Sequence, residues 1–228
     1  KWQHWWRGVH SARPESWGTV TMPLALILAL SATWTVGSDR VFALQIAFLV
    51  LALADPLAAW AGEAWGRREW VPRATVAGSV VFLIATVLLT GLGLFEIAGW
   101  SLGRTVAGVL LVAPVSTATE AVSRWGWDNL SVVVAVILVL IPLHETPGMV
   151  GQLGLALSIG FAFGVASHAT RTLGVGGAVG GGLFAASLVG LGGWAWALPG
   201  FVFFVLSSAL SLVAGRQVQT RHSEPEGG

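Results

Sequence analysis

Apolar runs long enough to cross a lipid bilayer recur along almost the whole chain, and short polar turns separate them. Only 10% of the 228 residues are charged, while 55% are hydrophobic. Soluble domains carry about 25% charged residues, so this composition excludes an ordinary soluble domain. The pattern predicts an all-α, polytopic membrane protein, because helices satisfy every backbone polar group within one segment.

We predict eight spans, at residues 18–36, 41–54, 75–95, 104–122, 130–143, 149–168, 176–191 and 195–214. The fifth is short for a bilayer crossing, and a re-entrant fifth segment would leave seven spanning helices. The expected parts are an interfacial N-terminal segment (1–17), a membrane domain (18–168), the start of a second membrane domain (169–215) and a polar tail (216–228).

The basic residues predict which side of the membrane each loop lies on. If the N-terminus is cytoplasmic, ten of the twelve lysines and arginines fall on the cytoplasmic side, and only Arg40 and Arg104 fall outside. Cytoplasmic loops of membrane proteins carry such an excess. We therefore expect a multi-pass protein of the cell membrane with a cytoplasmic N-terminus. The net charge of +1 gives no reason to expect a nucleic-acid partner, and the absence of cysteine excludes thiolate metal sites.

A carboxylate, Asp55, stands at the end of the second apolar run and is followed by Pro56. Ionisable groups within membrane segments are costly and mark functional sites. Asp is a favoured helix N-cap and Pro a favoured first helical residue. The pair therefore predicts that the second span breaks at Asp55-Pro56 and that a further helical segment runs to about Gly66.

Small residues recur every four positions in that segment, at Ala58, Gly62 and Gly66, so they share one helix face. Such a face lets another backbone or a ligand approach closely. Arg67 and Arg68 follow it and could contact phosphate oxygens. The alternative is a helix-packing face with an N-cap Asp and two arginines placed by membrane orientation.

A second polar cluster joins the fourth and fifth predicted spans, and it contains Glu120, Asp128 and Asn129. Two carboxylates and an amide suit Mg²⁺ coordination or deprotonation of a hydroxyl. The structural alternative pairs Glu120 with Arg124 four residues later and uses Asp128 as a helix cap. In contrast, His144 and Glu145 are predicted to lie in a solvated turn.

Four ordered motifs resemble the polyprenol kinase family, which includes dolichol kinase, phytol kinase and CTP-dependent diacylglycerol kinase. The segment Asp55-Pro56-Leu57-Ala58 with Gly62 and Gly66 is similar to its central motif. Glu15–Pro23 resembles the segment before the preceding span, Ala77-Gly78-Ser79 a later Gly-Ser step, and 120–130 the Glu-x-x-Ser and Asp-Asn-Leu segment. Together the four cover about residues 15–131. The family's N-terminal helices are not evident in this sequence.

The resemblance implies a membrane kinase that transfers a phosphoryl group from CTP, or another nucleotide, to an isoprenoid alcohol such as phytol or a polyprenol. It implies catalytic roles for Asp55, Glu120 and Asp128, with Mg²⁺ held by Asp55 and Asp128. The nucleotide-binding residues that it implies are Ala58, Gly62, Gly66, Arg67, Arg68, Arg73, Gly78, Ser79 and Asn129. The active site is then expected on the cytoplasmic side, with membrane lipid around the acceptor.

Two other functions remain open at this point. One is an integral-membrane cytidylyltransferase, a class similar to the polyprenol kinases. The other is an ion-coupled transporter that uses Asp55 and Glu120 as ion sites within the membrane. Separately, about residues 167–215 resemble the start of a membrane family that includes transmembrane protein 19.

Overall fold

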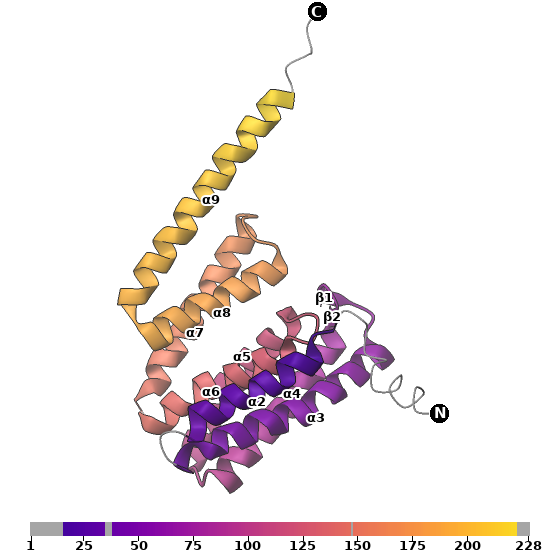
Figure 1. Cartoon of the computed structure of the whole chain (residues 1–228), viewed down its shortest axis with the longest axis vertical. Helices are drawn as coiled ribbons and strands as arrows, with labels where there is room; N and C mark the ends of the chain where they lie inside the picture. The colour runs from indigo at the N-terminus through magenta and orange to yellow at the C-terminus, as the bar shows by residue number, and fades with distance from the viewer. Residues whose placement is uncertain (1–15, 35–37, 147, 223–228) are drawn as a thin grey trace, which may run out of the picture. The chain divides into compact units, whose positions relative to one another are not determined.

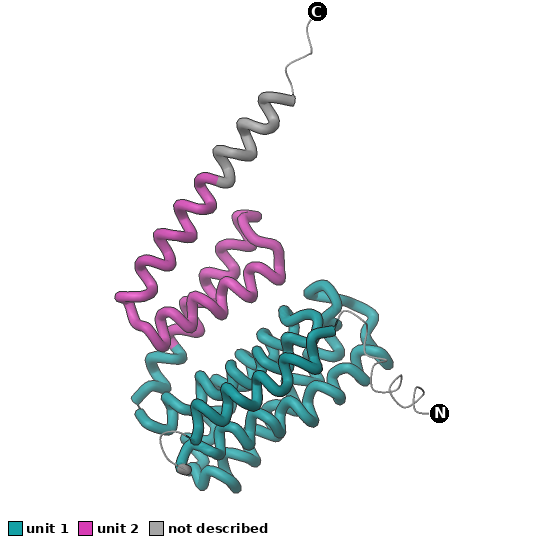
Figure 2. The backbone as a smooth tube through the Cα atoms, viewed as in Figure 1, with its two compact units in different colours: residues 1–154 teal, residues 155–228 magenta. Residues whose placement is uncertain are grey.

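The computed structural model describes residues 16–34, 38–146 and 148–222, so most of the interfacial segment 1–17, including Glu15, and the end of the polar tail lie outside the described residues. The chain forms two compact units, Lys1–Gly154 and Leu155–Gly228 (Figure 2). The division falls inside one helix, α7 (Met149–Ala169). The division expected from the sequence, between 168 and 169, lies at the end of the same helix.

Unit 1 is a bundle of helices that run beside one another (Figure 1). Its elements are α2 (Gly18–Trp34), η1 (Ser38–Arg40), α3 (Val41–Trp65), β1 (Glu69–Val71), β2 (Ala74–Thr75), α4 (Val76–Leu92), η2 (Gly93–Ile97), α5 (Leu102–Val122) and α6 (Asp128–Glu145). Helix α3 packs against α2, α4 and α6, and α5 packs against α4 and α6. The core is rich in small and β-branched side chains, such as Ala43, Val50 and Val136, so the helix axes approach closely.

Six helices of the described residues are long and apolar enough to cross a membrane, namely α3, α4 with η2, α5, α6, α7 and α8 (Val175–Gly192). Two further apolar helical segments, Gly18–Trp34 and Trp194–Leu210, are shorter. The all-α polytopic membrane class is therefore confirmed, while the count of eight spans stays a prediction. The fifth predicted span corresponds to α6, which begins earlier than expected and is long enough to cross.

The predicted break at Asp55-Pro56 is wrong, because α3 continues without interruption from Val41 to Trp65. Pro56 lies in the helix interior and only removes one intrahelical hydrogen bond there. Neighbouring helices in a bundle make such a loss tolerable. Asp55 is therefore a mid-helix residue whose side chain does not cap a new helix.

The segment from Gly62 to Arg73 leads from α3 to α4. The last turn of α3 occupies its first part, and strands β1 and β2 then form a short antiparallel hairpin in which Val71 faces Ala74. Arg73 stands at its turn with a φ of 76°. The hairpin leads directly into the first turn of α4.

The opposite end of unit 1 is closed by charged and aromatic side chains. Arg104 Nη2 donates hydrogen bonds of 2.8 Å to the carbonyl oxygens of Leu143 and His144, at the end of α6. Glu145 forms an ion pair with Arg40, and His144 stacks on Trp100 with an interplanar angle of 6°. The prediction of a solvated turn at His144 and Glu145 is therefore wrong, because residues distant in the sequence supply partners for both.

Unit 2 contains most of α7, then α8 and α9 (Trp194–His222). Glycine allows α7 and α8 to touch: a Cβ on Gly160 would lie 2.3 Å from the carbonyl oxygen of Gly182. Helices α8 and α9 also pack together, and the Phe163 and Phe204 rings meet edge to face, with centroids 4.8 Å apart. The resemblance of about residues 167–215 to the family of transmembrane protein 19 stays a prediction.

Candidate active site

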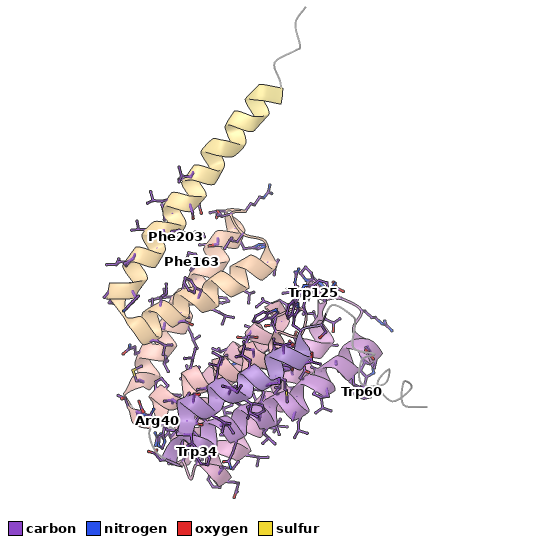
Figure 3. All side chains as sticks on the ribbon, viewed as in Figure 1. Trp34, Arg40, Trp60, Trp125, Phe163 and Phe203 are labelled. Atoms are coloured by element: carbon purple, nitrogen blue, oxygen red, sulfur yellow. The ribbon has the colours of Figure 1, made fainter. Side chains whose placement is uncertain are left out.

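Three segments meet at one end of unit 1, which we call the polar end: the start of α2, the β1–β2 hairpin and the loop between α5 and α6. Trp17 N donates a 2.7 Å hydrogen bond to the carbonyl oxygen of Trp125, and the Thr21 hydroxyl donates to that of Gly126. Figure 3 places Trp125 at this end and Arg40 at the other. The start of α2 and the α5–α6 loop, about a hundred residues apart in sequence, are thus hydrogen-bonded to each other.

A glycine makes this contact between α2 and the α5–α6 loop possible. Gly126 has a φ of +83°, and a Cβ on it would lie 2.5 Å from the backbone nitrogen of Gly18. Only glycine adopts this conformation without cost and leaves that space free. Asn129 lies at the same contact, where its side-chain amide donates to the Gly18 carbonyl oxygen at 3.5 Å.

The small residues of α3 serve a helix contact in this structure. A Cβ on Gly62 would lie 3.0 Å from Thr75 Oγ1, and one on Gly66 would lie 2.7 Å from Thr75 Cγ2. On the other side, a Cβ on Gly78 would lie 3.0 Å from the Ala58 carbonyl oxygen. Of the two partners left open by the sequence, the structure therefore shows another part of the protein: the backbone of α4 at Gly78 lies against Ala58 and Gly62, and the Thr75 side chain lies against Gly62 and Gly66.

The start of α4 is held by side-chain hydrogen bonds. Thr75 caps the helix, because its hydroxyl accepts a 3.1 Å bond from Gly78 N. Trp70 Nε1 donates a 2.9 Å bond to Ser79 Oγ, which links the hairpin to the first turn of α4. Gly78 and Ser79 are both buried. Their hydrogen-bonding groups thus stabilise the polar end whether or not a nucleotide binds there.

Three carboxylates converge at the polar end, from three different helices. Asp55 comes from α3, Glu120 from the last turn of α5 and Asp128 from the first residue of α6. Each is partly buried, and the three interact electrostatically with one another. Like charges held together in a poorly hydrated place repel one another, so this arrangement suits a cation or a proton.

Two oxygens of these carboxylates lack any hydrogen-bond donor. Among the described residues, Glu120 Oε2 and Asp128 Oδ1 are enclosed and have no partner. Buried polar atoms are ordinarily hydrogen-bonded, and exceptions often mark functional groups. Each of the two oxygens can therefore accept a further hydrogen bond or contact an ion.

The fold contains neither of the structural roles that the sequence offered for Glu120 and Asp128, an ion pair with Arg124 and a helix cap. Helix α5 ends at Val122, so Arg124 lies beyond the helix and within the described residues makes no ion pair with Glu120. The N-cap of α6 is Trp127, without a side-chain capping bond, so Asp128 does not cap the helix. Neither carboxylate has the structural role that sequence spacing offered.

The donor set fits a hard cation only in part. Carboxylate oxygens are the ligands that Mg²⁺ prefers, and Mg²⁺ commonly takes one or two of them together with substrate phosphates and water. Over residues 16–34, 38–146 and 148–222, no three His, Cys, Asp or Glu side chains are grouped closely enough to hold a metal by themselves. Asp55 and Asp128 thus suit a magnesium ion that phosphates help to bind.

The arginines of the polar end differ in their surroundings. Arg67 and Arg68 are exposed just beyond α3. Arg73 is exposed too, but its guanidinium lies over the ring of Trp125, 4.4 Å from the centroid. Cationic side chains and α-helix starts with free N–H groups favour phosphate, so the polar end offers positive charge around its carboxylates.

Sequence reasoning missed Trp70, Thr75 and Trp125, which hold the polar end together. A Thr three residues before Gly78 is a capping signal that could have revealed the start of α4. Trp125 contacts Arg73 and Trp17, which are distant in the sequence, whereas Trp70 reaches Ser79 nine residues later; no local sequence pattern indicates either contact.

The fold and this end of the bundle define a multi-pass helical membrane protein with an acidic site between three helices. The curated phytol kinase of Synechocystis sp. is 33% identical to the chain over 128 residues, 54% of this chain and 53% of that protein. The chain thus spans about half the length of the curated relative it matches. No family model matches the chain, and no solved structure matches it.

Proposed function

We propose that this protein is a lipid kinase, which transfers the γ-phosphoryl group of a nucleotide, CTP in the first instance, to an isoprenoid alcohol such as phytol or a polyprenol. One observation carries the proposal: Asp55, Glu120 and Asp128 interact at the end of a membrane bundle, and two of their oxygens lack donors among the described residues. The relation to a phytol kinase supports the choice of reaction.

In this proposal Asp55 and Asp128 bind Mg²⁺ together with the nucleotide phosphates. The ion would neutralise phosphate charge, which is the main requirement of phosphoryl transfer. Arg67, Arg68 and Arg73 contact phosphate oxygens from the hairpin side, and Asn129 adds a polar ligand. Ala58, Gly62, Gly66, Gly78 and Ser79 act indirectly, because their packing fixes the distance between α3 and α4.

Glu120 is the general base of the proposed reaction. The alcohol oxygen forms a bond to the γ-phosphorus, and the bond from that phosphorus to the bridging oxygen breaks. The hydroxyl proton passes to Glu120 and then to water, and the nucleotide leaves as the diphosphate. The catalytic requirement is positioning of the hydroxyl beside both groups.

The lipid acceptor reaches this site from the bilayer. Apolar side chains such as Leu53 and Leu57 are about half exposed on the outer surface of α3, on the helix face opposite Asp55. An isoprenoid chain can lie along such an apolar surface, and its hydroxyl would have to enter between the helices to reach the carboxylates. The cytoplasm supplies the nucleotide, which agrees with the orientation expected from the basic residues.

The proposal is tested with purified protein, a panel of nucleoside triphosphates and a panel of lipid alcohols, with product masses as the readout. We expect a lipid monophosphate and a nucleoside diphosphate from CTP and an isoprenoid alcohol. Asp55→Asn should abolish transfer, whereas Glu63→Gln, an exposed carboxylate on the same helix, should leave it intact. A CMP-linked lipid with pyrophosphate identifies a cytidylyltransferase, and ion flux without nucleotide consumption identifies a transporter.

A further inference from the structure

A second unpartnered side chain lies one helical turn before Glu120, on the same helix. Among the described residues, the Ser116 hydroxyl is enclosed without a hydrogen-bond partner, and the residue has 0% exposure. Ser116 and Glu120 are four positions apart on α5, so their side chains lie on one helix face, about 6 Å apart along the axis.

Neighbouring hydroxyls on α5 behave differently. Thr117 Oγ1 donates to the Ala113 carbonyl oxygen at 2.8 Å, and Thr119 Oγ1 donates to that of Val115 at 2.7 Å. This bond to the preceding turn is the usual way for a helical hydroxyl to be satisfied. Ser116 does not use it, so its donor stays available for another group.

An acceptor on the same helix face that lacks a donor is Glu120 Oε2. Side chains of a helix tilt toward its N-terminus, and a long one covers the turn before its own Cα. The carboxylate of Glu120 therefore leans over the turn that contains Ser116, and Oε2 is its enclosed oxygen. Rotation about the side-chain bonds of these two residues can bring the hydroxyl and Oε2 into contact without moving the helix.

We propose that Ser116 is a positioning residue for Glu120, an inference that rests on the proposed kinase function. Its hydroxyl donates to Oε2 and so fixes the carboxylate with Oε1 toward the acceptor alcohol. When Glu120 takes the alcohol proton, the Ser116 hydroxyl can rotate and accept, since a hydroxyl is both donor and acceptor. Ser116 itself touches neither substrate.

This role predicts opposite effects on stability and on turnover. Ser116→Ala removes a buried hydroxyl without a partner, so the unfolding midpoint of the purified protein should stay the same or rise. Turnover should fall about tenfold, the loss expected when a base is no longer held in position, while the KM values for nucleotide and alcohol change little. Ser116→Cys, with a weaker donor, should give an intermediate turnover. Thr117→Ala is the matched control, and its turnover should be unchanged.

A double-mutant cycle distinguishes action through Glu120 from a general effect. In a Glu120→Gln background, adding Ser116→Ala should change the residual turnover less than twofold, because residues that act as a unit are not additive. An independent tenfold loss in that background would overturn the inference, as would unchanged turnover of Ser116→Ala in an active protein. If the wild-type protein transfers no phosphoryl group, the proposed function fails, and this inference fails with it.

Discussion

The guanidinium of Arg73 lies over the ring of Trp125, 4.4 Å from its centroid, and joins the β1–β2 turn to the α5–α6 loop. Arg73 holds this position with a φ of 76°, a conformation that costs a residue with a Cβ about 1 kcal/mol or more. Asn or Gly would adopt it more easily. The unfavourable backbone conformation of Arg73 therefore occurs where its side chain contacts the α5–α6 loop.

Replacing Arg73 with glycine distinguishes the effect of its side chain from the effect of its backbone conformation. Arg73→Gly relieves the backbone conformation and removes the cation, so we expect stability to change by less than about 1 kcal/mol. The KM for the nucleotide should rise several-fold, measured by steady-state transfer assays. Arg124→Ala, which removes an exposed arginine of the adjoining loop, is the control. A normal KM in Arg73→Gly would remove Arg73 from the nucleotide site.

The contact between α3 and α4 should be intolerant of larger residues at Gly66. A Cβ there would lie 2.2 Å from the Gly62 carbonyl oxygen and 2.7 Å from Thr75 Cγ2, so Gly66→Ala should lower the free energy of unfolding by about 1–3 kcal/mol. Denaturant unfolding in detergent measures this. Gly103→Ala in α5 meets nothing within 4 Å and should be neutral or slightly stabilising. Equal effects of the two changes would contradict the packing role.

Neutralising one carboxylate of the site should not weaken the fold. Asp55→Asn removes a charge that interacts unfavourably with Asp128 and Glu120, so we expect stability to stay equal or to rise by about 1 kcal/mol. Mg²⁺ with CTP should raise the unfolding midpoint of the wild-type protein, because ligands stabilise the state they bind.

That ligand-induced increase should disappear in Asp55→Asn and in Asp128→Asn, and it should persist in Glu63→Gln. Thermal unfolding with and without EDTA measures all four proteins. An undiminished increase in both Asn variants would exclude these carboxylates as the place where the ion and nucleotide bind.

Arg104 is expected to matter for stability and not for substrate binding. Its two hydrogen bonds satisfy carbonyl groups at the end of α6, and its guanidinium lies 4.1 Å from the Trp100 ring centroid. Arg104→Ala should cost about 2–3 kcal/mol of unfolding free energy. The KM for the nucleotide should not change, because Arg104 belongs to the end of unit 1 that lies away from the carboxylates. Unfolding and transfer assays on one preparation test both statements.

The helices were largely predictable because one physical constraint dominates them. A membrane helix must be apolar for about 20 residues, and this signal is local, so α4, α5 and α7 lie close to their predicted ranges. The error at Pro56 has a physical cause: propensity rules describe isolated helices, whereas packing against α2, α4 and α6 carries α3 through the proline. The β1–β2 hairpin lacked the length and alternation that announce strands.

The site was predictable in its acidic residues and less so in its contacts. A carboxylate at the end of an apolar run is conspicuous whatever surrounds it, which singled out Asp55 and Glu120. Their convergence with Asp128 is set by the packing of three helices. The glycines illustrate the limit: spacing showed that Gly62 and Gly66 share a face, but only the fold shows that Thr75 fills the space beside them.

The helices that carry Asp55 and Glu120 each contain an interior proline near the carboxylate, Pro56 in α3 and Pro114 in α5. Since proline donates no hydrogen bond, the backbone is one bond short at each place and bends there with less resistance. A bend of α3 or α5 would therefore require the least energy at these two prolines, between the polar end and the end held by Arg104.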